Sequence, residues 1–305
     1  MKDLVTVVMP CYNMGNYISQ ALEGVASQTY INWEVIVVDD CGPSDGFEDI
    51  VLDFKERHKK NRVKLIRHQH NRGVCAARNT AIDYAKGAFI APLDPDDYWM
   101  PNHLETAVSY FLADRDLYFY SCFANIFYLE NDSRIKQIER YMEWELRFFP
   151  YSLALRNAIP NSSAVLRRAV FEEVGYYDEN KDIHQVGDYD LWIRIIKSGL
   201  KTNIHNASNI FYRKHPTGAT SNMEKMIEAK SLLVKKHQEW FTNYRHEVIE
   251  RLSGNLITQD IHITKLKNKH QALERRIAVL EQTIAKLKSL PILKQILGLK
   301  NSLSK

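Results

Sequence analysis

The sequence predicts an α/β protein in which a doubly wound, mostly parallel sheet is followed by a C-terminal helical coiled-coil extension. Over the first hundred residues, continuous apolar runs alternate with helical patterns, which is typical of parallel strands buried on both faces. From about residue 223 the chain becomes long and charged, and apolar residues recur at heptad spacing. We therefore expect an α/β domain at 1–222, a helical coiled-coil region at 223–290 and a basic amphipathic tail at 291–305.

The first half of the α/β domain is predicted to contain four strands with a helix after each of the first three. Each strand is a short apolar or β-branched run that ends in turn-forming residues. The expected strands are Leu4–Pro10, Trp33–Asp40, Val63–His68 and Ala88–Asp94, and the expected helices are Tyr17–Gln28, Phe47–Lys59 and Val74–Ala85.

The second half has a less regular pattern. An aromatic, strand-like stretch is followed by segments with helical spacing, and Gly199 is a stop signal for one of them. The expected strands are Leu117–Arg140, Ser162–Arg168 and Thr202–His215, and the expected helices are Glu143–Arg156, Ala169–Val174 and Gly187–Gly199.

Composition excludes several classes of protein. A formal net charge of +4 over 305 residues is too small and too dispersed to indicate nucleic-acid binding. The four cysteines are widely spaced without a C-x-x-C pair, which favours reduced thiols in a cytosolic protein. No apolar run reaches the ~18 residues needed to span a bilayer, and the N-terminus has no signal-peptide pattern. We expect a cytoplasmic protein.

The stretch "IAPLDPDDYWMP" places three carboxylates within four residues. Asp94 and Asp96 are two residues apart, so an extended backbone turns both to one side. Oxygen ligands on one side suit a hard divalent cation that also holds substrate phosphates. The alternative is a solvated acidic turn in which Asp97 caps the next helix. The carboxyl ends of the first two strands carry "PCYN" and "DDCGPSDG", and ligands of such sheets bind at this edge, which favours a binding site.

These residues resemble a known family. "VTVVMPCYNMGNYISQALEGVASQTYINWEVIVVDDCGPSDG", "NRGVCAARNTAIDYAKGAFIAPLDPDD", "NSSAVLRRAVFEEVGYYDE" and "GDYDLWIRI" are similar to family 2 glycosyltransferases of the GT-A fold. The likeness covers about residues 4–215 in the family's order and spacing. It implies transfer of a sugar from a nucleotide-diphosphate donor to a hydroxyl acceptor. Each motif alone has modest specificity, but together they are highly specific.

The resemblance assigns the first two loops to the nucleotide. Asp40 matches the aspartate that contacts the base, and its carboxylate can accept the imide N–H of a uracil. Pro10, Tyr12 and Asn13 follow the first strand, where an aromatic ring can stack on the base and backbone groups approach the nucleotide. An Asx-turn at Asp40 and ordinary loop packing of the other residues are the alternatives.

The D-x-D of the family matches Asp94 and Asp96. The resemblance implies that Asp94 lies near the ribose and the metal, and that Asp96 binds Mn²⁺ or Mg²⁺ directly. His215 is a candidate for an additional contact to the metal or diphosphate, and a structural histidine is its alternative. Arg78 is expected either to pair with Asp94 or to approach the diphosphate.

Asp188 matches the general base of the family, which removes the proton of the acceptor hydroxyl. Its alternatives are a helix N-cap at Asp188 and a competing base at Asp190. The chain departs from many relatives at Gly187, where they carry a second acid. One base and one direct displacement imply an inverting enzyme. The absence of a Q-x-x-R-W-type motif after Asp188 favours addition of a single sugar.

The expected function is transfer from a UDP-sugar to a glycan or lipid-linked acceptor in cell-surface glycan synthesis. A sugar nucleotidyltransferase is an alternative, but the loop after the first strand lacks the Gly-rich, basic phosphate site that it needs. A catalytically inactive domain that serves as a coiled-coil scaffold is the other alternative, and the joint presence of the four matched aspartates argues against it.

The C-terminal region predicts a homodimer. Ten of the twelve heptad core positions from Ile249 to Leu287 are Ile or Leu, and only Gln259 and His270 are polar. Ile at a and Leu at d favour a parallel two-stranded coiled coil. The last fifteen residues mix apolar side chains with lysines and carry no acid, which suits a peripheral contact with the inner face of a membrane. A helix docked on its own domain with a frayed tail is the alternative.

Overall fold

The computed structural model describes residues 3–58, 62–130, 134–141, 149–154, 157–215 and 223–244, with positions 271, 274, 275, 278 and 280–282 of the C-terminal region. The chain forms two compact units, Met1–Arg245 and His246–Lys305.

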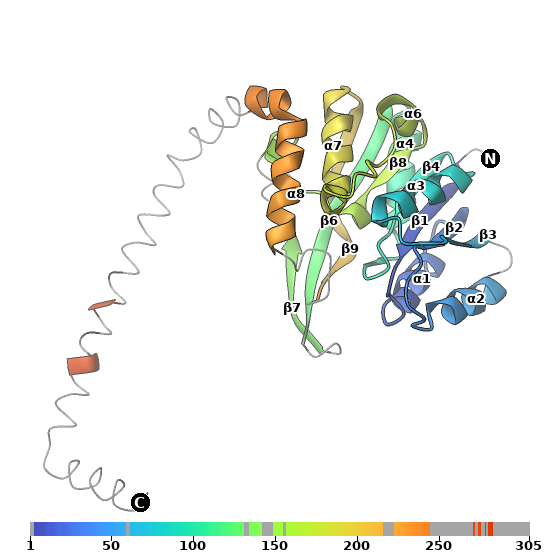
Figure 1. Ribbon diagram of the computed structural model, residues 1–305, viewed down its shortest axis with the longest axis horizontal. Helices are drawn as coiled ribbons and strands as arrows, with labels where there is room; N and C mark the ends of the chain where they lie inside the picture. Colours follow the sequence, from blue (N-terminus) through green and yellow to red (C-terminus); the bar gives the residue numbers. More distant parts are fainter. Residues whose placement is uncertain are drawn as a thin grey trace, which may run out of the picture. The chain divides into compact units, whose positions relative to one another are not determined.

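A nine-stranded sheet forms the framework, in the order β3-β2-β1-β4-β8-β6-β9-β5, with β7 paired to β6 (Figure 1). The first four strands of this order are mutually parallel, as the continuous apolar runs predicted. They are β3 (Arg62–Arg67), β2 (Trp33–Asp39), β1 (Val5–Cys11) and β4 (Phe89–Pro92).

The other half of the sheet corrects the expectation of a mostly parallel sheet. Among its pairings only β6 with β9 is parallel, so parallel and antiparallel pairs are equally numerous in the described sheet. β6 and β7 pair antiparallel because only three residues separate them, whereas a parallel pair needs a connection of about a dozen residues or more. These strands are β5 (Tyr98–Trp99), β6 (Leu117–Glu130), β7 (Arg134–Tyr141), β8 (Val165–Arg167) and β9 (Lys201–Lys214).

The helices agree with the predicted positions over most of the chain. Only residues 149–154 of the segment expected as helix 143–156 are described together, and Tyr151–Ala154 forms a 3-10 turn, η1. The remaining elements are α1 (Ile18–Ala26), α2 (Phe47–Arg57), α3 (Val74–Tyr84), α4 (His103–Ala113), η2 (Asn161–Ser163), α6 (Ala169–Val174), η3 (His184–Val186), α7 (Gly187–Lys197) and α8 (Met223–Lys236).

The parallel strands are buried on both faces, and each face has its own apolar core. Along β1, Val5, Val7 and Met9 belong to the core formed with α1, α2 and α4, whereas Val8 belongs to the core formed with α3, α6 and α7. This alternation follows from the two-residue period of a strand. Helices therefore cover both faces and leave the carboxyl ends of the parallel strands to loops.

α8 packs against the α/β unit, although the sequence placed it beyond the α/β domain at residue 223. Its Ala229 and Leu233, and Trp240 of the helical residues 238–244 that follow, are buried in the core of α3, α6 and α7. Figure 1 shows α8 beside α7. The heptads predicted from Ile249 to Leu287 lie almost wholly outside the described residues, so the dimer stays a prediction.

Candidate active site

The loops after β1 and β2 are tied together at the carboxyl edge of the sheet. Pro10 is buried within β1, and Tyr12 projects with 49% of its surface exposed. Asn13 adopts a left-handed φ of 56°, a conformation that asparagine tolerates better than most residues. Asp45 of the second loop accepts the backbone N–H of Gly15 at 2.6 Å. The exposed side chain of Tyr12 thus projects from a loop that Asp45 of the second loop holds in place.

Asp40 is fixed by three donors. Its Oδ1 accepts the backbone N–H of Arg72 (2.8 Å) and bonds to Nδ1 of His68 (2.7 Å), while Oδ2 accepts the backbone N–H of Gly73 (2.7 Å). Nε2 of His68 bonds in turn to Thr80 Oγ1 at 2.9 Å. Each carboxylate oxygen can accept two bonds, so Oδ2 retains capacity for one further donor. The side chain is orientated before any ligand binds.

Asp94 pairs with Arg78, one of the two roles that the sequence allowed for this arginine. Nη2 of Arg78 donates to Asp94 Oδ1 at 2.7 Å, and Asn161 Nδ2 donates to the same oxygen at 3.1 Å. Burial opposes the positive charge of Arg78, but the neighbouring Asp94 keeps the pKa of the guanidinium above its usual value. Tyr177 orients Asn161, because its hydroxyl donates to Asn161 Oδ1 at 3.1 Å.

Asp96 and His215 meet although they are 119 residues apart. Nε2 of His215 lies 3.0 Å from Asp96 Oδ2, and the imidazole packs against the ring of Tyr17 at a centroid distance of 4.9 Å. β9 ends one residue before His215, and β9 pairs with β5, which follows the acidic cluster directly. The sheet therefore brings together the two side chains that the sequence proposed as metal contacts.

Asp97 has a structural role, and the alternative that it caps the next helix is wrong. Its carboxylate is 1% exposed, accepts the Ser162 hydroxyl proton at 2.6 Å and accepts the backbone N–H of Arg213 at 2.9 Å. Burial first, and then the charges of Asp96 and Asp94, raise the pKa of Asp97 well above its usual range. The three carboxylates of the cluster thus have three different environments.

Asp188 lies in the first turn of α7 and is partly buried. Its Oδ2 accepts a hydrogen bond from Asn157 Nδ2 at 2.9 Å, and its Oδ1 accepts the backbone N–H of Tyr189 at 2.7 Å. Burial raises the pKa of Asp188, Arg78 opposes that rise, and Asp94 adds to it. A carboxylate with a raised pKa is a better proton acceptor than a freely solvated one.

Asp190, the competing base, is fully buried and engaged elsewhere. Arg194 Nε donates to its Oδ2 at 2.8 Å, and Lys236 Nζ and His237 Nε2 lie 2.6 Å and 2.8 Å from its Oδ1. Burial alone would raise the pKa of Asp190, but the hydrogen bonds from His237 and Lys236 outweigh it and hold the pKa well below the usual value. This carboxylate joins α8 to α7.

Gly187 lies against the side chain of Cys75. A Cβ at this position would lie 2.3 Å from Sγ of Cys75 on α3. The thiol therefore occupies the space that a side chain would need, which gives a physical reason for the departure from relatives with an acid here. Cys75 also donates to the backbone oxygen of His184 at 3.5 Å, so α3 fixes the turn that enters α7.

The sequence missed several residues of the site. Asn157 contacts the candidate base, Asn161 and Tyr177 hold Asp94, and His68 holds Asp40. The stretch "NAIPNSS", with its two asparagines around a turn, is the local signal that could have identified Asn157 and Asn161.

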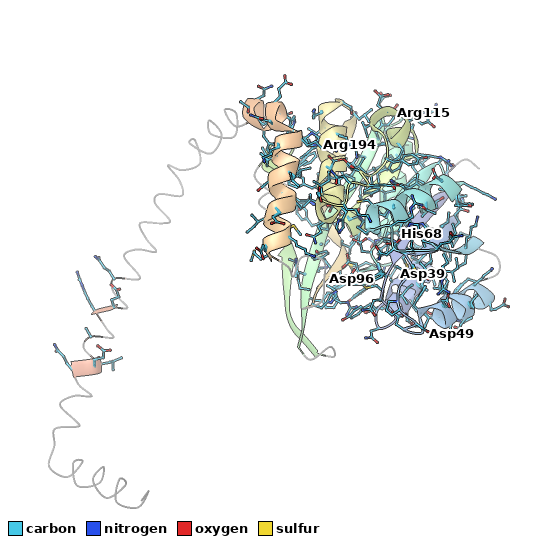
Figure 2. All side chains as sticks on the ribbon, in the orientation of Figure 1. Asp39, Asp49, His68, Asp96, Arg115 and Arg194 are labelled. Carbon is cyan, nitrogen blue, oxygen red and sulfur yellow. The ribbon has the colours of Figure 1, made fainter. Side chains whose placement is uncertain are left out.

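Figure 2 shows Asp39, which bonds to Arg67, and Asp96 toward one end of the unit, whereas Arg194 and Arg115 lie toward the other end.

Asp96 and His215 fit a divalent cation. Mg²⁺ and related hard ions commonly use one or two carboxylates together with substrate phosphates and waters. Within the described part of the chain, no group of three His, Cys, Asp or Glu side chains could hold a metal ion. Asp94 is less suited than Asp96 to bind a cation directly, because its Oδ1 already accepts hydrogen bonds from Arg78 and Asn161.

Comparison with solved structures defines the class of fold. Over 77% of this chain, the structure is similar to a mannosyltransferase from Pyrobaculum calidifontis solved with GDP-Man and Mn²⁺, with a TM-score of 0.60 and 19% identity. It is similar over the same share to residues 1–349 of TarS from S. aureus, solved with UDP, with a TM-score of 0.57 and 19% identity. The matches cover 65% and 64% of those chains, and they identify the GT-A fold.

Sequence comparison identifies the family. Residues 6–175 match the model for "Glycosyl transferase family 2". A β-1,3-glucosyltransferase of Escherichia coli, WfgD, is 34% identical over 195 residues, which are 64% of this chain and 70% of the relative. A second one, WfaP, is 28% identical over 76% of this chain and 86% of its own length. This chain belongs to glycosyl transferase family 2, and it has the GT-A fold expected from its sequence.

Proposed function

We propose that the protein transfers one sugar from a UDP-sugar to a hydroxyl of a glycan or lipid-linked acceptor, with inversion at the anomeric carbon. The observation that carries this proposal is the environment of Asp188. It lies in the electrostatic field of Arg78 and Asp94, its pKa is raised mainly by burial, and Asn157 fixes its orientation. A carboxylate that is fixed in orientation, at the edge of a GT-A sheet where the nucleotide binds, is suited to act as the base in a direct displacement.

The donor is proposed to bind through Asp40 and the loop after β1. The imide N–H of uracil can donate to Asp40 Oδ2, which has one acceptor position left, and Tyr12 offers an exposed ring for stacking on the base. Pro10 and Asn13 shape the backbone against the nucleotide. The names of WfgD and WfaP describe both as using UDP-Glc and an acceptor of GlcNAc-diphosphoundecaprenol, which supports a uridine donor and a membrane-linked glycan acceptor here.

Mn²⁺ or Mg²⁺ is proposed to be held by Asp96, with His215 and Asp94 beside it. When bound, such an ion neutralises charge on the diphosphate. Arg78 donates to Asp94 Oδ1 at 2.7 Å and so fixes this aspartate, which supports its proposed place near the ribose and the metal. The proposal needs no rearrangement of β5 or β9, because these strands already place Asp96 and His215 together.

The chemical step is proposed as a single displacement. Asp188 accepts the proton of the acceptor hydroxyl as that oxygen forms a bond to the anomeric carbon. The bond from this carbon to the diphosphate oxygen breaks, and the nucleoside diphosphate leaves with the electron pair. Attack from the face opposite to the leaving group inverts the anomeric centre. A positioned base of this kind contributes typically about 10²–10⁴-fold.

The C-terminal unit is proposed to assemble and localise the enzyme. The heptads from Ile249 to Leu287 would join two chains in parallel, and the basic tail 291–305 would bind an anionic membrane surface, where two tails raise the avidity. No helix in the described part of the chain is long and apolar enough to cross a membrane. A cytoplasmic enzyme at the inner face of the membrane would reach a lipid-linked acceptor.

Calorimetry with UDP tests the donor and metal assignments. We expect UDP to bind more tightly with Mn²⁺ than in EDTA, and more tightly than GDP or dTDP. Equal affinity in EDTA would refute the role of the metal, and a clear preference for GDP or dTDP would refute the assignment of uracil as the base.

The variant Asp188→Asn tests the catalytic assignment. It keeps the shape of the side chain but cannot accept a proton, so turnover should fall by roughly 10²-fold or more while UDP affinity stays near that of the native protein. A retained anomeric configuration in the product, measured by NMR, would refute the single displacement.

A further inference from the structure

One arginine of β9 contacts the acidic turn at two consecutive residues. Arg213 donates its backbone N–H to the carboxylate of Asp97 at 2.9 Å, and its side-chain Nε donates to the backbone oxygen of Asp96 at 2.6 Å. The second contact fixes the main chain of the residue whose carboxylate the proposed cation would use. None of the roles proposed above uses the side chain of Arg213.

The guanidinium of Arg213 has further partners on α1 and β6. Its Nη2 donates to Oε1 of Gln20, and the group lies over the rings of Tyr17 and Phe127, at 4.9 Å and 4.7 Å from their centroids. The planar fork thus joins two hydrogen-bond acceptors while it lies against two aromatic rings. A lysine cannot reproduce this arrangement, because its ammonium is a compact point charge that does not form a planar fork.

The ring of Tyr17 also connects Arg213 with His215. The imidazole of His215 lies 4.9 Å from this ring, and its Nε2 lies 3.0 Å from Asp96 Oδ2. Arg213 and His215 are two residues apart at the end of β9, so an extended backbone turns both side chains to one side. Both members of the proposed metal pair therefore contact the cluster of Arg213, Asp96 through its backbone oxygen and His215 through Tyr17.

The positive charge of Arg213 does not explain these contacts. The residue is 8% exposed, and its side-chain hydrogen bonds in the described part of the chain go to a backbone oxygen and an amide oxygen rather than to a carboxylate. Burying a charge that is not paired costs free energy. A guanidinium close to a metal site also repels the metal ion. The contribution that favours the site is the fixed geometry, not the charge.

We propose that Arg213 is a positioning residue that raises the affinity of the site for a divalent cation by fixing Asp96 and His215. The inference rests on the proposed function, because it concerns the same cation. It adds a residue that acts on the cation through its two proposed ligands.

Two calorimetric titrations of the full chain test this role, one of Mn²⁺ at saturating UDP and one of UDP in EDTA. Arg213→Lys keeps the charge and loses the fork, so Mn²⁺ affinity should fall by about 10–100-fold, the usual effect of losing an outer-shell partner of a metal ligand. UDP affinity in EDTA should stay near that of the native protein. A general structural defect would lower both affinities.

Arg167 provides a matched control, because it makes the same kinds of contact at the opposite edge of the sheet. Its Nε donates to the backbone oxygen of Leu117 at 2.6 Å, and its guanidinium lies over the rings of Phe89 and Phe111, at 5.5 Å and 5.3 Å from their centroids. It pairs with Phe89, the first residue of β4, whereas the acidic turn follows the last. Arg167→Lys should therefore leave both titrations unchanged.

Arg213→Met removes the charge as well as the fork, and it keeps the test available if the lysine variant does not fold. Relief of the repulsion should offset part of the loss, so its Mn²⁺ affinity should lie between those of Arg213→Lys and the native protein. Tighter Mn²⁺ binding by Arg213→Met than by the native protein would assign the effect to charge and overturn the proposal. Native Mn²⁺ affinity in Arg213→Lys, or an equal loss in Arg167→Lys, would also overturn it.

The native protein separates this inference from the proposed function. If it binds UDP equally with Mn²⁺ and in EDTA, the metal part of the proposed function fails, and the role of Arg213 fails with it. If the native protein shows the metal dependence and the Arg213 variants retain it in full, only the positioning role is refuted.

Discussion

The carboxylate of Asp190 should determine whether α8 stays attached to the catalytic unit. We consider the substitution Asp190→Asn, which preserves the shape of the side chain and removes its charge. In the native protein Oδ2 pairs with Arg194 at 2.8 Å, and Oδ1 pairs with Lys236 and His237 at 2.6 Å and 2.8 Å. The asparagine would keep one acceptor oxygen and direct an amide N–H₂ group at a cationic partner.

The magnitude follows from the burial of Lys236 and His237, two of the three partners. Removing one member of a buried ion pair costs typically about 3–5 kcal/mol, because the remaining charge is left uncompensated. The Lys236 side chain is 35% exposed and can regain water, whereas the His237 side chain is 4% exposed. We therefore expect a value near the lower limit, about 3 kcal/mol. For a unit of this size, about 2–4 °C per kcal/mol gives a fall in melting temperature of about 6–12 °C.

Thermal and urea unfolding of the full chain measure this effect. Asp178→Asn is a matched control, since Asp178 Oδ2 also pairs with Lys236 Nζ at 2.6 Å but its side chain is 29% exposed. The control should change stability by at most about 1 kcal/mol. Equal effects of the two substitutions, or an Asp190→Asn variant as stable as the native protein, would refute the role assigned to burial.

The Asp190 carboxylate also predicts how the stability of the protein depends on pH. The pKa of Asp190 is lowered in the folded protein, so the folded state binds this proton less readily than the unfolded chain. Its stabilising contribution is complete above the unfolded value of about 3.9 and is lost as the pH falls toward the folded value. Acid titration should therefore destabilise the native protein more than Asp190→Asn, and parallel acid curves for the two would contradict this.

Three further predictions concern other parts of the chain. Gly187→Ala should destabilise the protein by about 1–3 kcal/mol through overpacking against Cys75, and adding Cys75→Ala should restore most of the loss in a double-mutant cycle; additive losses would contradict the contact. Asp97→Asn should keep the bond from the Arg213 backbone N–H and remove a buried charge, so the unfolding free energy should stay within about 1 kcal/mol or rise; a loss above about 3 kcal/mol by urea unfolding would contradict this. A chain ending at Glu247 should be monomeric by light scattering and should not sediment with anionic vesicles, whereas the full chain should be dimeric and should sediment with them. A full chain that is monomeric at micromolar concentration would refute the coiled coil, and one that stays in the supernatant would refute the membrane contact.

The sequence predicted those parts of the fold that are set by local pattern. β1 and β2 agree with their apolar runs because both are buried on both faces, and α7 begins at the predicted Gly187. The pairing of β6 with β8 and β9 is non-local and leaves no periodic signal, so the mixed half of the sheet was missed. α8 was separated from the domain because its charged composition conceals the few buried positions, such as Leu233, that dock it.

The candidate site shows the same limit. Asp96 and His215 were both proposed from short motifs, and the structure places them 3.0 Å apart. The role of Asp97 depends on Ser162, 65 residues later in the chain, and on Arg213, 116 residues later. No feature within the acidic cluster distinguishes a carboxylate that faces a ligand from one that is buried against a hydroxyl. That distinction arises only when η2 and β9 cover the turn.

The close approach of Cys75 to Gly187 couples substitutions at two positions that are 112 residues apart in the sequence. A side chain at position 187 would need either a different rotamer of Cys75 or a smaller residue at position 75, because its Cβ would otherwise lie 2.3 Å from the sulfur. We therefore expect positions 75 and 187 to vary together among relatives, and those that carry an acid before the base to favour a smaller residue on the facing helix.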